Sequence, residues 1–358
     1  MPASSIDTFF ACSLMVILIA SAMVSTAKLV QPYLNTLANT SGIDRCRGLA
    51  NYLLQNRGLP SNWGSDRNST PLVFGLASEM QEPYTLDLDK VSRLNSKNTY
   101  AITYEQILVA LGTSDISFNI QLRTVFQVAI QSVLSQNLGS ETLHTFRVFT
   151  TKSGFPISTQ LRAYSVLDSY VGSITSSTDS DGVGTINCTL PNSLNGTALL
   201  TVLAKAKAYP QMMTFNAHSF AHNSETPPPN GTFLSLSPLD HVLSISLQEP
   251  TLEVAGAYAF TYGYDFSLSP IPLGNQSIEC SIPNLSEASP MILVVNGHNG
   301  SASFAEWTAY PPLPLEIGAN LDDLNTTSKA EALAYLVSVN HVLYECVITL
   351  RSVPYVDA

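Results

Sequence analysis

The chain is poor in charged residues, and the few that it has are mostly acidic. Asp, Glu, Lys and Arg make up only 12% of its 358 residues, and the formal net charge is −11. Nucleic acids and anionic lipid headgroups bind surfaces rich in Lys and Arg, because their phosphate groups are negative. The composition therefore argues against both as partners.

Long apolar runs are also scarce, since only one is long enough to cross a bilayer. Residues 9–27 contain no charge and are mostly Leu, Ile, Val, Met, Phe and Ala. A helix of this length, rising about 1.5 Å per residue, just spans a hydrocarbon core of roughly 30 Å. We therefore expect an N-terminal transmembrane helix over 1–28, with the lipid bilayer as the partner of 9–27. A buried soluble helix is the alternative.

The segment before this run, MPASSID, lacks Lys and Arg. A cleaved signal peptide begins with a basic segment and has an apolar centre of about 7–15 residues. Both differences favour a retained anchor, although Ser25-Thr26-Ala27 has the small residues of a cleavage site. The nearby cation, Lys28, follows the run, so the positive-inside rule gives no support for export of the C-terminal part.

Glycosylation sequons indicate the side of the membrane instead. An N-x-[ST] tripeptide accepts N-linked glycans in exported proteins, although each single match is weak evidence. The sequons lie at Asn39, Asn68, Asn187, Asn195, Asn230, Asn275, Asn284, Asn299 and Asn325. Spread from end to end, they favour a glycoprotein that crosses the membrane once and has its C-terminal body outside the cell.

Cysteine is rare. Cys12 lies inside the apolar run, and the other four are Cys46, Cys188, Cys280 and Cys346. An even number suits disulfides in an oxidising compartment, and four buried thiols are the alternative. No CxxC or Cys/His spacing indicates a zinc site.

Motifs for catalysis or for binding cofactors and metals are missing. The sequence has no GxSxG elbow, P-loop, dinucleotide fingerprint or SxxK motif, so no residue is nominated as catalytic or cofactor-binding. His218 and His222 have a metal-ligand spacing, but on a strand-like segment and without the Glu of HExxH. Residues 179–182, DSDG, are more simply a hairpin tip than a calcium loop. We expect no metal, no cofactor and no enzymatic activity.

Helical signals follow the apolar run. Apolar residues at i, i+3 and i+4 spacing continue to Leu53, and Gly58 and Pro60 should end this helix. Residues 86–95 are expected to form a short helix or turn, with Asp89 as its N-cap.

Further local patterns lie between residues 60 and 130. Thr103 and Gln106 match a capping box, so a helix should follow and end at Gly112. Apolar and polar residues then alternate over 116–130, as in half-buried strands. Trp63, in GLPSNWGSD, is expected to clamp its loop onto the fold rather than to bind a sugar.

Four segments resemble archaeal, membrane-anchored, type IV pilin-like surface proteins: LANYLLQNRGLPSNWG, FGLAS and YTLDLDKVSRLN behind the apolar span, and the C-terminal AYLVSVNHVLYECVITL. The resemblance covers about residues 1–125 and 330–352. It implies a long helix packed on an antiparallel sheet and displayed outside the cell. This base would occupy 29–141, and the C-terminal segment 313–358 would complete it.

The middle of the chain contains a repeat. INCTLPN at 186–192 matches IECSIPN at 278–284, 92 residues later, and apolar strands follow both. Short alternating runs between Gly, Pro, Ser, Thr and Asn are typical of β-sandwiches, and GFPISTQLRAYSV resembles immunoglobulin-like modules of prokaryotic surface proteins. We expect two such sandwiches, at 142–223 and 230–312, with the Pro-rich linker 224–232 between them. Chance similarity is the alternative.

The C-terminal segment should form a hairpin with Asn340 and His341 in its turn. The residues of its second strand that share one face are Val342, Tyr344, Cys346, Ile348 and Leu350. Cys46 lies in the apolar stripe of the long helix, so Cys46 and Cys346 would form a disulfide if the helix packs on this sheet. Cys188 and Cys280 would form one only if the sandwiches lie side by side.

These features together predict an α+β, mainly β fold. A long N-terminal membrane helix runs into a pilin-like helix-on-sheet base, into which two immunoglobulin-like β-sandwiches are inserted. The predicted function is non-enzymatic and structural or adhesive, either as a filament-associated subunit or as a single anchored module. Other copies of the chain or envelope proteins are the expected partners, through edge strands. The alternative is an anchored extracellular enzyme or ligand-binding protein with a site between the sandwiches.

Overall fold

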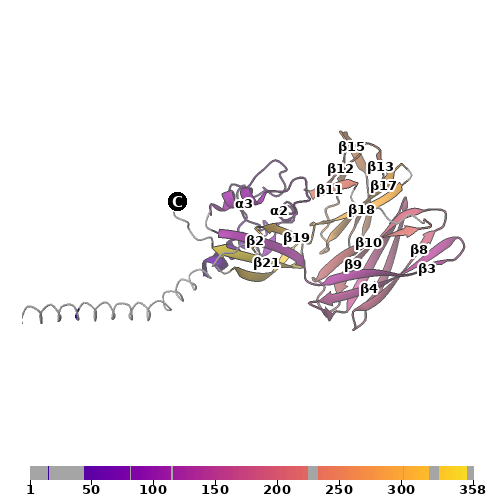
Figure 1. Ribbon diagram of the computed structural model, residues 1–358, viewed down its shortest axis with the longest axis horizontal. Coiled ribbons are helices and arrows are strands. Elements are labelled where there is room, and N and C mark those ends of the chain that lie inside the picture. The colour runs from indigo at the N-terminus through magenta and orange to yellow at the C-terminus, as the bar shows by residue number, and fades with distance from the viewer. Residues whose placement is uncertain are drawn as a thin grey trace, which may run out of the picture. The chain divides into compact units, whose positions relative to one another are not determined.

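The computed structural model describes Met15 and residues 44–80, 82–113, 116–224, 233–300, 302–321 and 330–352 (Figure 1). The chain divides into two compact units, Met1–Ala50 and Asn51–Ala358. Apart from Met15, the predicted membrane helix lies outside the described residues, as do Asn39, Asn230 and Asn325. Among the residues that are described, no helix combines the length and the apolar character needed to cross a membrane.

Residues 44–55 are helical, and this helix ends shortly before the predicted stop at Gly58 and Pro60. In the second unit, its last turn includes Leu53 and Leu54, both fully buried. Their burial agrees with the apolar stripe that predicted the helix.

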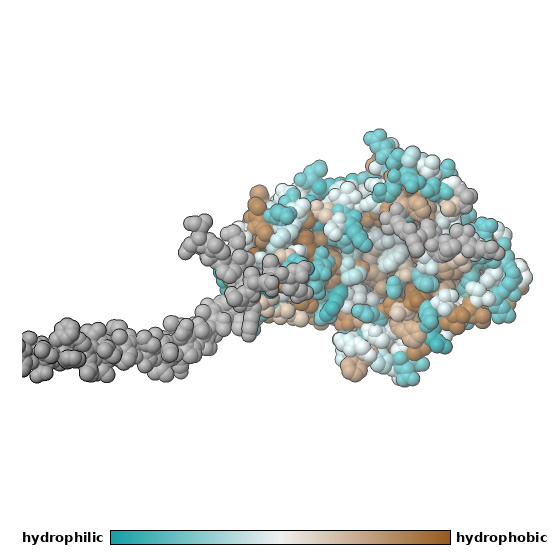
Figure 2. Space-filling view, viewed as in Figure 1, coloured by the Kyte–Doolittle hydropathy of each residue, from teal (hydrophilic) through white to brown (hydrophobic). Residues whose placement is uncertain are grey.

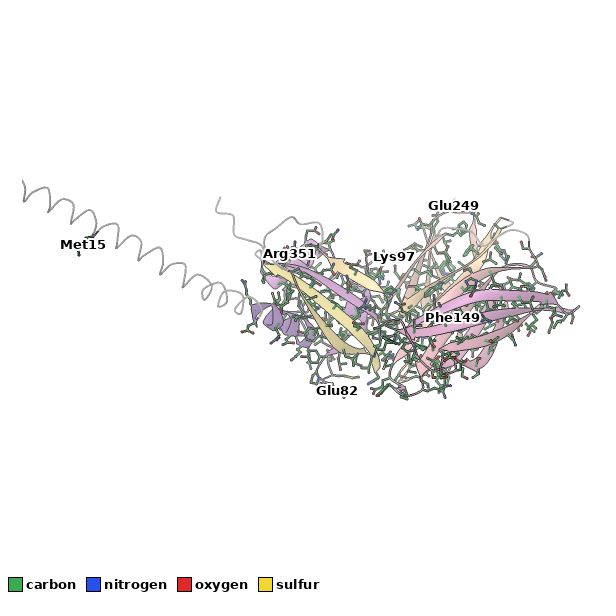
Figure 3. The ribbon with its side chains drawn as sticks, turned by 60° about the horizontal axis from the view of Figure 1, so that its bottom comes forward. Met15, Glu82, Lys97, Phe149, Glu249 and Arg351 are labelled. Carbon is green, nitrogen blue, oxygen red and sulfur yellow. The ribbon has the colours of Figure 1, made fainter. Side chains whose placement is uncertain are left out.

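The second unit begins with a base built on a five-stranded sheet. Its strands, in spatial order, are β1 (Thr85–Leu86), β20 (Glu331–Val339), β21 (Val342–Ser352), β2 (Ile116–Thr124) and β19 (Leu315–Gly318). The predicted hairpin is confirmed as β20 and β21, joined by Asn340 and His341 at φ of 48° and 63°. The five residues predicted to share one face of β21 are all fully buried. Arg351 marks the end of this strand in Figure 3.

Two short helices belong to the base, α2 (Leu88–Ser92) and α3 (Tyr104–Leu111). The capping box predicted for α3 is confirmed. The backbone N–H of Gln106 donates to Thr103 Oγ1 over 3.2 Å, and the N–H of Thr103 donates to Gln106 Oε1 over 2.9 Å. Gly112 ends the helix at φ 62°, a left-handed conformation that glycine adopts without steric cost.

The two sandwiches are inserted into the base sheet. The chain leaves the base after β2 and returns to it in β19, and these strands are antiparallel neighbours, with Leu122 opposite Leu315. The strand by which the chain leaves the base and the strand by which it returns therefore lie side by side. Both sandwiches are thus attached to the base at one place.

The first sandwich has two facing sheets. One contains β3 (Gln127–Asn137), β4 (Glu141–Lys152), β5 (Phe155–Pro156) and β8 (Val183–Pro191), and the other has the order β10 (Met213–His222), β9 (Gly196–Ala206), β6 (Thr159–Leu167), β7 (Tyr170–Ser177). The predicted start at 142 is wrong. β3 pairs with β4 from Gln127 to Asn137, so the alternation predicted to continue in the base belongs to this sandwich instead.

The second sandwich repeats this plan. One sheet has the order β11 (Leu234–Leu239), β12 (Val242–Leu247), β16 (Ser277–Ser281), β15 (Pro270–Gly274), and the other has the order β14 (Asp265–Leu268), β13 (Leu252–Phe260), β17 (Met291–Asn299), β18 (Ala302–Tyr310). In chain order this is the ABED and C′CFG arrangement of immunoglobulin-type sandwiches. The two repeat segments lie on the equivalent strands β8 and β16, and the prediction of a mainly β fold with sandwich modules is confirmed.

The sandwiches pack against each other through their β6–β9 and β13–β18 sheets. The ring of Tyr164 stacks on Phe260 with centroids 4.5 Å apart, and the Tyr164 hydroxyl donates to the carbonyl of Thr261 over 2.8 Å. Further along, the N–H of Thr197 donates to Ser303 Oγ over 2.7 Å. This shared face makes them one block rather than two modules in a row.

The second sandwich is also joined to the base. The Asn98 side chain donates to the carbonyl of Pro238 over 3.1 Å, and the N–H of Thr99 donates to Ser237 Oγ over 2.9 Å. The Arg67 guanidinium pairs with Glu279 at 2.5 Å. Side chains of the base thus reach the β11–β12–β16 sheet, while the opposite sheet meets the first sandwich.

Neither predicted disulfide is present, since the described cysteines form none. Cys188 and Cys280 are each buried in the core of their own sandwich, on the sheets that face away from the shared contact. The sandwiches do lie side by side, but this orientation separates the two sulfur atoms. Cys346 is fully buried in the base sheet, and Cys46 is half-buried in the helical segment of the first unit.

Three thiols are therefore expected to be reduced and slow to react. Burial raises the pKa of Cys280 to about 11, that of Cys346 to about 12 and that of Cys188 above its usual value. Alkylation requires the thiolate, so iodoacetamide at pH 8 should leave these three unmodified in the folded protein. In denaturant without reductant, mass spectrometry should find all three alkylated. Modification that occurs only after reduction would show that they are oxidised.

Candidate functional site

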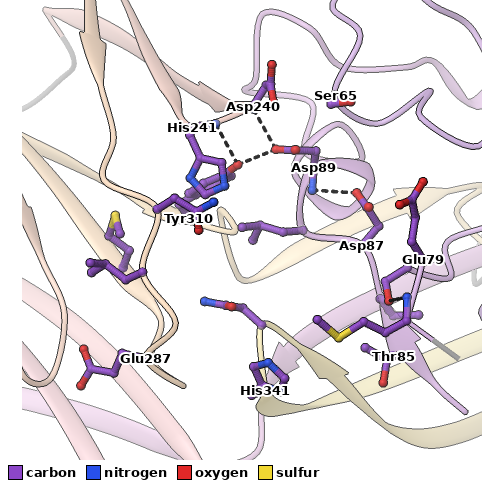
Figure 4. A pocket seen from close by; sticks show the side chains of 18 of the residues that line it. Ser65, Glu79, Thr85, Asp87, Asp89, Asp240, His241, Glu287, Tyr310 and His341 are labelled. Carbon is purple, nitrogen blue, oxygen red and sulfur yellow. Dashed lines mark hydrogen bonds between the residues drawn. The ribbon is translucent and has the colours of Figure 1, made fainter. Parts of the chain in front are cut away.

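A cavity of about 490 Å³ lies where the base meets the second sandwich (Figure 4). Four parts of the chain line it: α2 with the loops before it, the β11–β12 turn with the end of β18, the segment 283–291 between β16 and β17 together with Thr261, and the β20–β21 turn. Its size falls within the range of about 300–1,000 Å³ that is usual for ligand pockets. No part of the sequence predicted a site here.

On the base side, two acids two residues apart have different roles. Asp87 is the N-cap of α2, and its Oδ1 accepts from the N–H groups of Asp89 and Lys90, each over 3.0 Å. The prediction of Asp89 as the cap is wrong, because the helix begins at Leu88, two residues earlier than that cap requires. Asp89 is thereby free to extend towards the second sandwich.

Asp89 forms a further polar contact between the base and the second sandwich, at the wall of the cavity. Its Oδ1 accepts a hydrogen bond from the Tyr310 hydroxyl over 2.5 Å and one from the N–H of Asp240 over 2.9 Å (Figure 4). Burial raises the pKa of Asp89, although both hydrogen bonds oppose this shift. The pKa of Tyr310 lies well above its usual value, because the ring is buried and its hydroxyl faces this carboxylate.

Two tight turns bring histidines to the cavity. Asp240 and His241 connect β11 to β12 at φ of 49° and 55°, and Asn340 and His341 connect β20 to β21 in the same way. Positive φ at both positions matches the twist of a two-residue hairpin, which Asn and Asp tolerate well. The His241 ring meets Tyr310 edge-on at 6.0 Å, and its buried Nδ1 has no hydrogen-bond partner among the described residues.

The lining is rich in hydrogen-bond acceptors and has no Lys or Arg. Its carboxylates belong to Glu79, Asp87, Asp89, Asp240 and Glu287. Glu287 accepts from the Thr261 hydroxyl over 2.6 Å. Ionised carboxylates only accept hydrogen bonds, so this cavity suits a group that carries several donors. In the described part of the chain, no three His, Cys, Asp or Glu side chains are grouped as a metal site requires.

Buried cations hold the loop that carries one wall of the cavity. Lys90 Nζ donates to the carbonyls of Arg57 and Ala77, each over 2.9 Å, and burial lowers the pKa of Lys90. Trp63 is fully buried and its Nε1 donates to the carbonyl of Gly75 over 3.2 Å. The prediction that Trp63 clamps its loop is confirmed.

The histidines singled out by spacing belong to another cluster. His218 and His222 both lie on β10, and His222 meets His144 of β4, with Nδ1 and Nε2 2.9 Å apart. His222 Nε2 lies 3.0 Å from the carbonyl of Pro191, and His144 Nδ1 lies 2.7 Å from Ser135 Oγ. Spacing along the chain missed this pair, because strand pairing across the sandwich brings the two rings together.

The directions of these hydrogen bonds depend on His222 Nε2, which lies 3.0 Å from the carbonyl of Pro191, an acceptor, and 2.9 Å from the side-chain nitrogen of Asn223, a donor. A hydrogen on Nε2 satisfies the carbonyl. The Nδ1 of a neutral His222 then accepts from His144 Nε2, and His144 Nδ1 accepts from the Ser135 hydroxyl. A proton added to His144 Nδ1 would be donated to Ser135 Oγ, so the hydrogen bond between the two rings excludes only the protonation of both at once.

The remaining sequence-predicted positions lie at the surface. Asp179 Oδ1 accepts from the N–H groups of Asp181 and Val183, as in a hairpin tip. Of the six sequon asparagines that the structure describes, Asn299 is half-buried and the others are exposed, namely Asn68, Asn187, Asn195, Asn275 and Asn284. Asn284 also lines the cavity.

Comparisons with known proteins add little. No protein-family model matches this chain, and no curated protein sequence matches it. A solved structure, the FN1–FN3 domains of chicken CNTN1, aligns with 50% of this chain at 11% identity and a TM-score of 0.19. The chain spans 64% of the length of that structure. A match this weak carries no argument about function, so the description of the sandwiches rests on their own strand order.

Proposed function

We propose that this chain is a non-enzymatic cell-surface protein with a structural or adhesive role. Residues 9–27 would hold it in the membrane, and the body from Asn51 onwards would lie outside the cell. The uncharged apolar run and the distribution of sequons support this placement, and five of the six described sequon asparagines are accessible to a glycosylating enzyme.

The observation that carries the proposal is the insertion of two mutually packed sandwiches into one base sheet. Because β2 and β19 are neighbours, the sandwiches are attached to the base by two adjacent strands. Contacts from the base to the second sandwich, and from the second to the first, then make a continuous block. Such a block suits display at a surface. The pilin-like character of the base remains part of this proposal.

Exposed apolar side chains offer a contact surface for the proposed partners, which are other copies of the chain or envelope proteins. Val133, Leu134 and Leu138 at the β3–β4 hairpin are each more than half exposed. Figure 2 shows hydrophobic and hydrophilic residues intermingled over the visible face of the body. The neighbouring apolar side chains at the tip of the β3–β4 hairpin favour contact with another protein.

The alternative of a site between the sandwiches is less favoured. The stacked rings of Tyr164 and Phe260 and the hydrogen bond from Thr197 to Ser303 occupy the shared face. Packed side chains leave little room for a substrate there.

The placement can be tested on intact cells that produce the chain. A protease that does not enter the cell should digest the body, and glycopeptide analysis should find sugar on exposed sequons such as Asn68 and Asn195. N-terminal sequencing should show that residues 9–27 are retained. A body protected from external protease and free of sugar would refute the proposal.

A further inference from the structure

We propose that the cavity between α2 and the second sandwich holds the first sugars of an N-linked glycan on Asn284. This inference rests on the proposed extracellular placement of the body. Asn284 opens the sequon Asn284-Leu285-Ser286, is exposed, and is the one described sequon asparagine in the cavity lining. A sugar attached there starts at the wall of the cavity.

The backbone is held in place on both sides of Asn284, by Ile282 before it and by Leu285 after it. The N–H of Ile282 donates to the carbonyl of His241 over 2.7 Å, so this segment is tied to the turn that carries His241. Ile282 is buried in the core of the second sandwich, and Leu285 packs against the same core. Asn284 therefore lies between two anchored residues, and its position relative to His241 is defined.

The lining has the chemistry that a sugar ring complements. Sugar hydroxyls are strong donors to ionised carboxylates, and such bonds are shorter and stronger than those between neutral groups. Asp240 and Glu79 present carboxylates without a cationic partner in the lining, and one oxygen of Glu287 accepts only from Thr261. The buried Nδ1 of His241 also lacks a partner. A ring with several hydroxyls would supply donors to these acceptors.

Another sequon provides a matched comparison on the same sandwich. Asn275 lies in the tight turn between β15 and β16, at φ 50°, and is exposed. It does not belong to the cavity lining. A glycan on Asn275 is therefore expected to extend into solvent, whereas a glycan on Asn284 is expected to lie against protein.

Periodate oxidation distinguishes these two situations for innermost sugars that carry adjacent free hydroxyls, because it cleaves the bond between the carbons that bear them. The full chain would be purified from cells that glycosylate it, treated with periodate in the folded and the denatured state, and digested for glycopeptide mass spectrometry. The innermost sugars on Asn284 should be oxidised about tenfold more slowly than those on Asn275 in the folded state, a protection of about 1.4 kcal/mol. In denaturant the two rates should be equal.

Two variants test the role of the glycan in stability. Ser286→Ala removes the Asn284 sequon without changing Asn284, and Ser277→Ala removes the Asn275 sequon in the same manner. Ser286→Ala should lower the midpoint of thermal unfolding by roughly 3 °C, which corresponds to the loss of about 1 kcal/mol of contacts in a chain of this size. Ser277→Ala should leave the midpoint unchanged.

The outcomes separate this inference from the proposed function. An unmodified Asn284 beside glycosylated Asn275 or Asn195 would overturn the inference and leave the extracellular placement intact. Equal oxidation of the two glycans in the folded protein would also overturn it. A body without sugar on any sequon would overturn the placement itself.

Discussion

Replacing Arg93 with methionine is expected to lower the free energy of unfolding by about 4 kcal/mol. Arg93 is almost fully buried, and its guanidinium donates to the backbone carbonyls of Trp63, Asp66, Ser69 and Tyr100. Burial lowers the pKa of Arg93, against the effect of nearby Asp66. Methionine fills similar volume but donates nothing, so the carbonyls of Trp63, Asp66 and Ser69 before α2, and that of Tyr100 after it, would each lose a donor. Urea unfolding of the purified body measures the loss.

Arg123→Met is the matched control for this effect. Arg123 also reaches a partner, because its guanidinium donates to both oxygens of Glu345 over 3.2 Å, but its side chain is 52% exposed. Water screens and replaces such a surface pair, so its loss should cost less than about 1 kcal/mol. Similar losses in the two variants would contradict the role assigned to Arg93.

Acid is expected to destabilise the first sandwich through His144 and His222. Burial, and secondarily the neighbouring His222, lowers the pKa of His144 from 6.5 to about 4. Phe146 and Phe220 surround the His144 ring, and no carboxylate contacts it among the described residues. Burial lowers the pKa of His222 as well, although its hydrogen bond to the carbonyl of Pro191 opposes this.

The sign of the pH dependence follows from proton binding. Between pH 6.5 and 4 the unfolded chain binds a proton at His144 that the folded chain does not, so stability falls as the pH falls. The contribution is fully present above pH 6.5 and is lost below about pH 4, with a total of about 3 kcal/mol and about 2 kcal/mol of it by pH 5. Urea unfolding at pH 7.5 and 5.0 measures the difference.

Two variants isolate this contribution from the carboxylates that titrate in the same range. His144→Gln keeps a polar side chain but cannot take up the proton, so its stability should change by about 2 kcal/mol less than that of the wild type between the two pH values. His298→Asn replaces a histidine of the second sandwich that is 43% exposed, so it leaves the contribution of His144 in place. If His144→Gln responds to acid as the wild type does, the pair is not the source of the effect.

The features predicted correctly from the sequence are those that neighbouring residues determine. The capping box at Thr103 needs only residues three positions apart, and the turn at Asn340 and His341 needs only two residues that adopt positive φ. The buried face of β21 follows from the alternation of a strand. The repeat around Cys188 and Cys280 predicted two similar modules, because similar short sequences form similar strands, here β8 and β16.

The predictions that failed depended on how elements meet. Residues around Val128 alternate equally well as a base strand or as a sandwich strand, and pairing with β4 decided between them. Asp87 and Asp89 both suit a helix N-cap. In the structure Asp87 is the cap, and Asp89 instead accepts a hydrogen bond from Tyr310 of the second sandwich. The cysteine pairing assumed that adjacent sandwiches bring equivalent strands together, whereas the opposite sheets are in contact.

The sequence by itself determined the class of the fold, its repeated modules and its local turns, because hydrophobic period and turn chemistry act over a few residues. Only the tertiary structure decided that Asp89, His241 and His341 line one cavity, and that His144 lies against His222. These residues are far apart along the chain, and they come close in space only because particular sheets pack against each other. That choice follows from the summed burial of whole faces, which no short segment specifies.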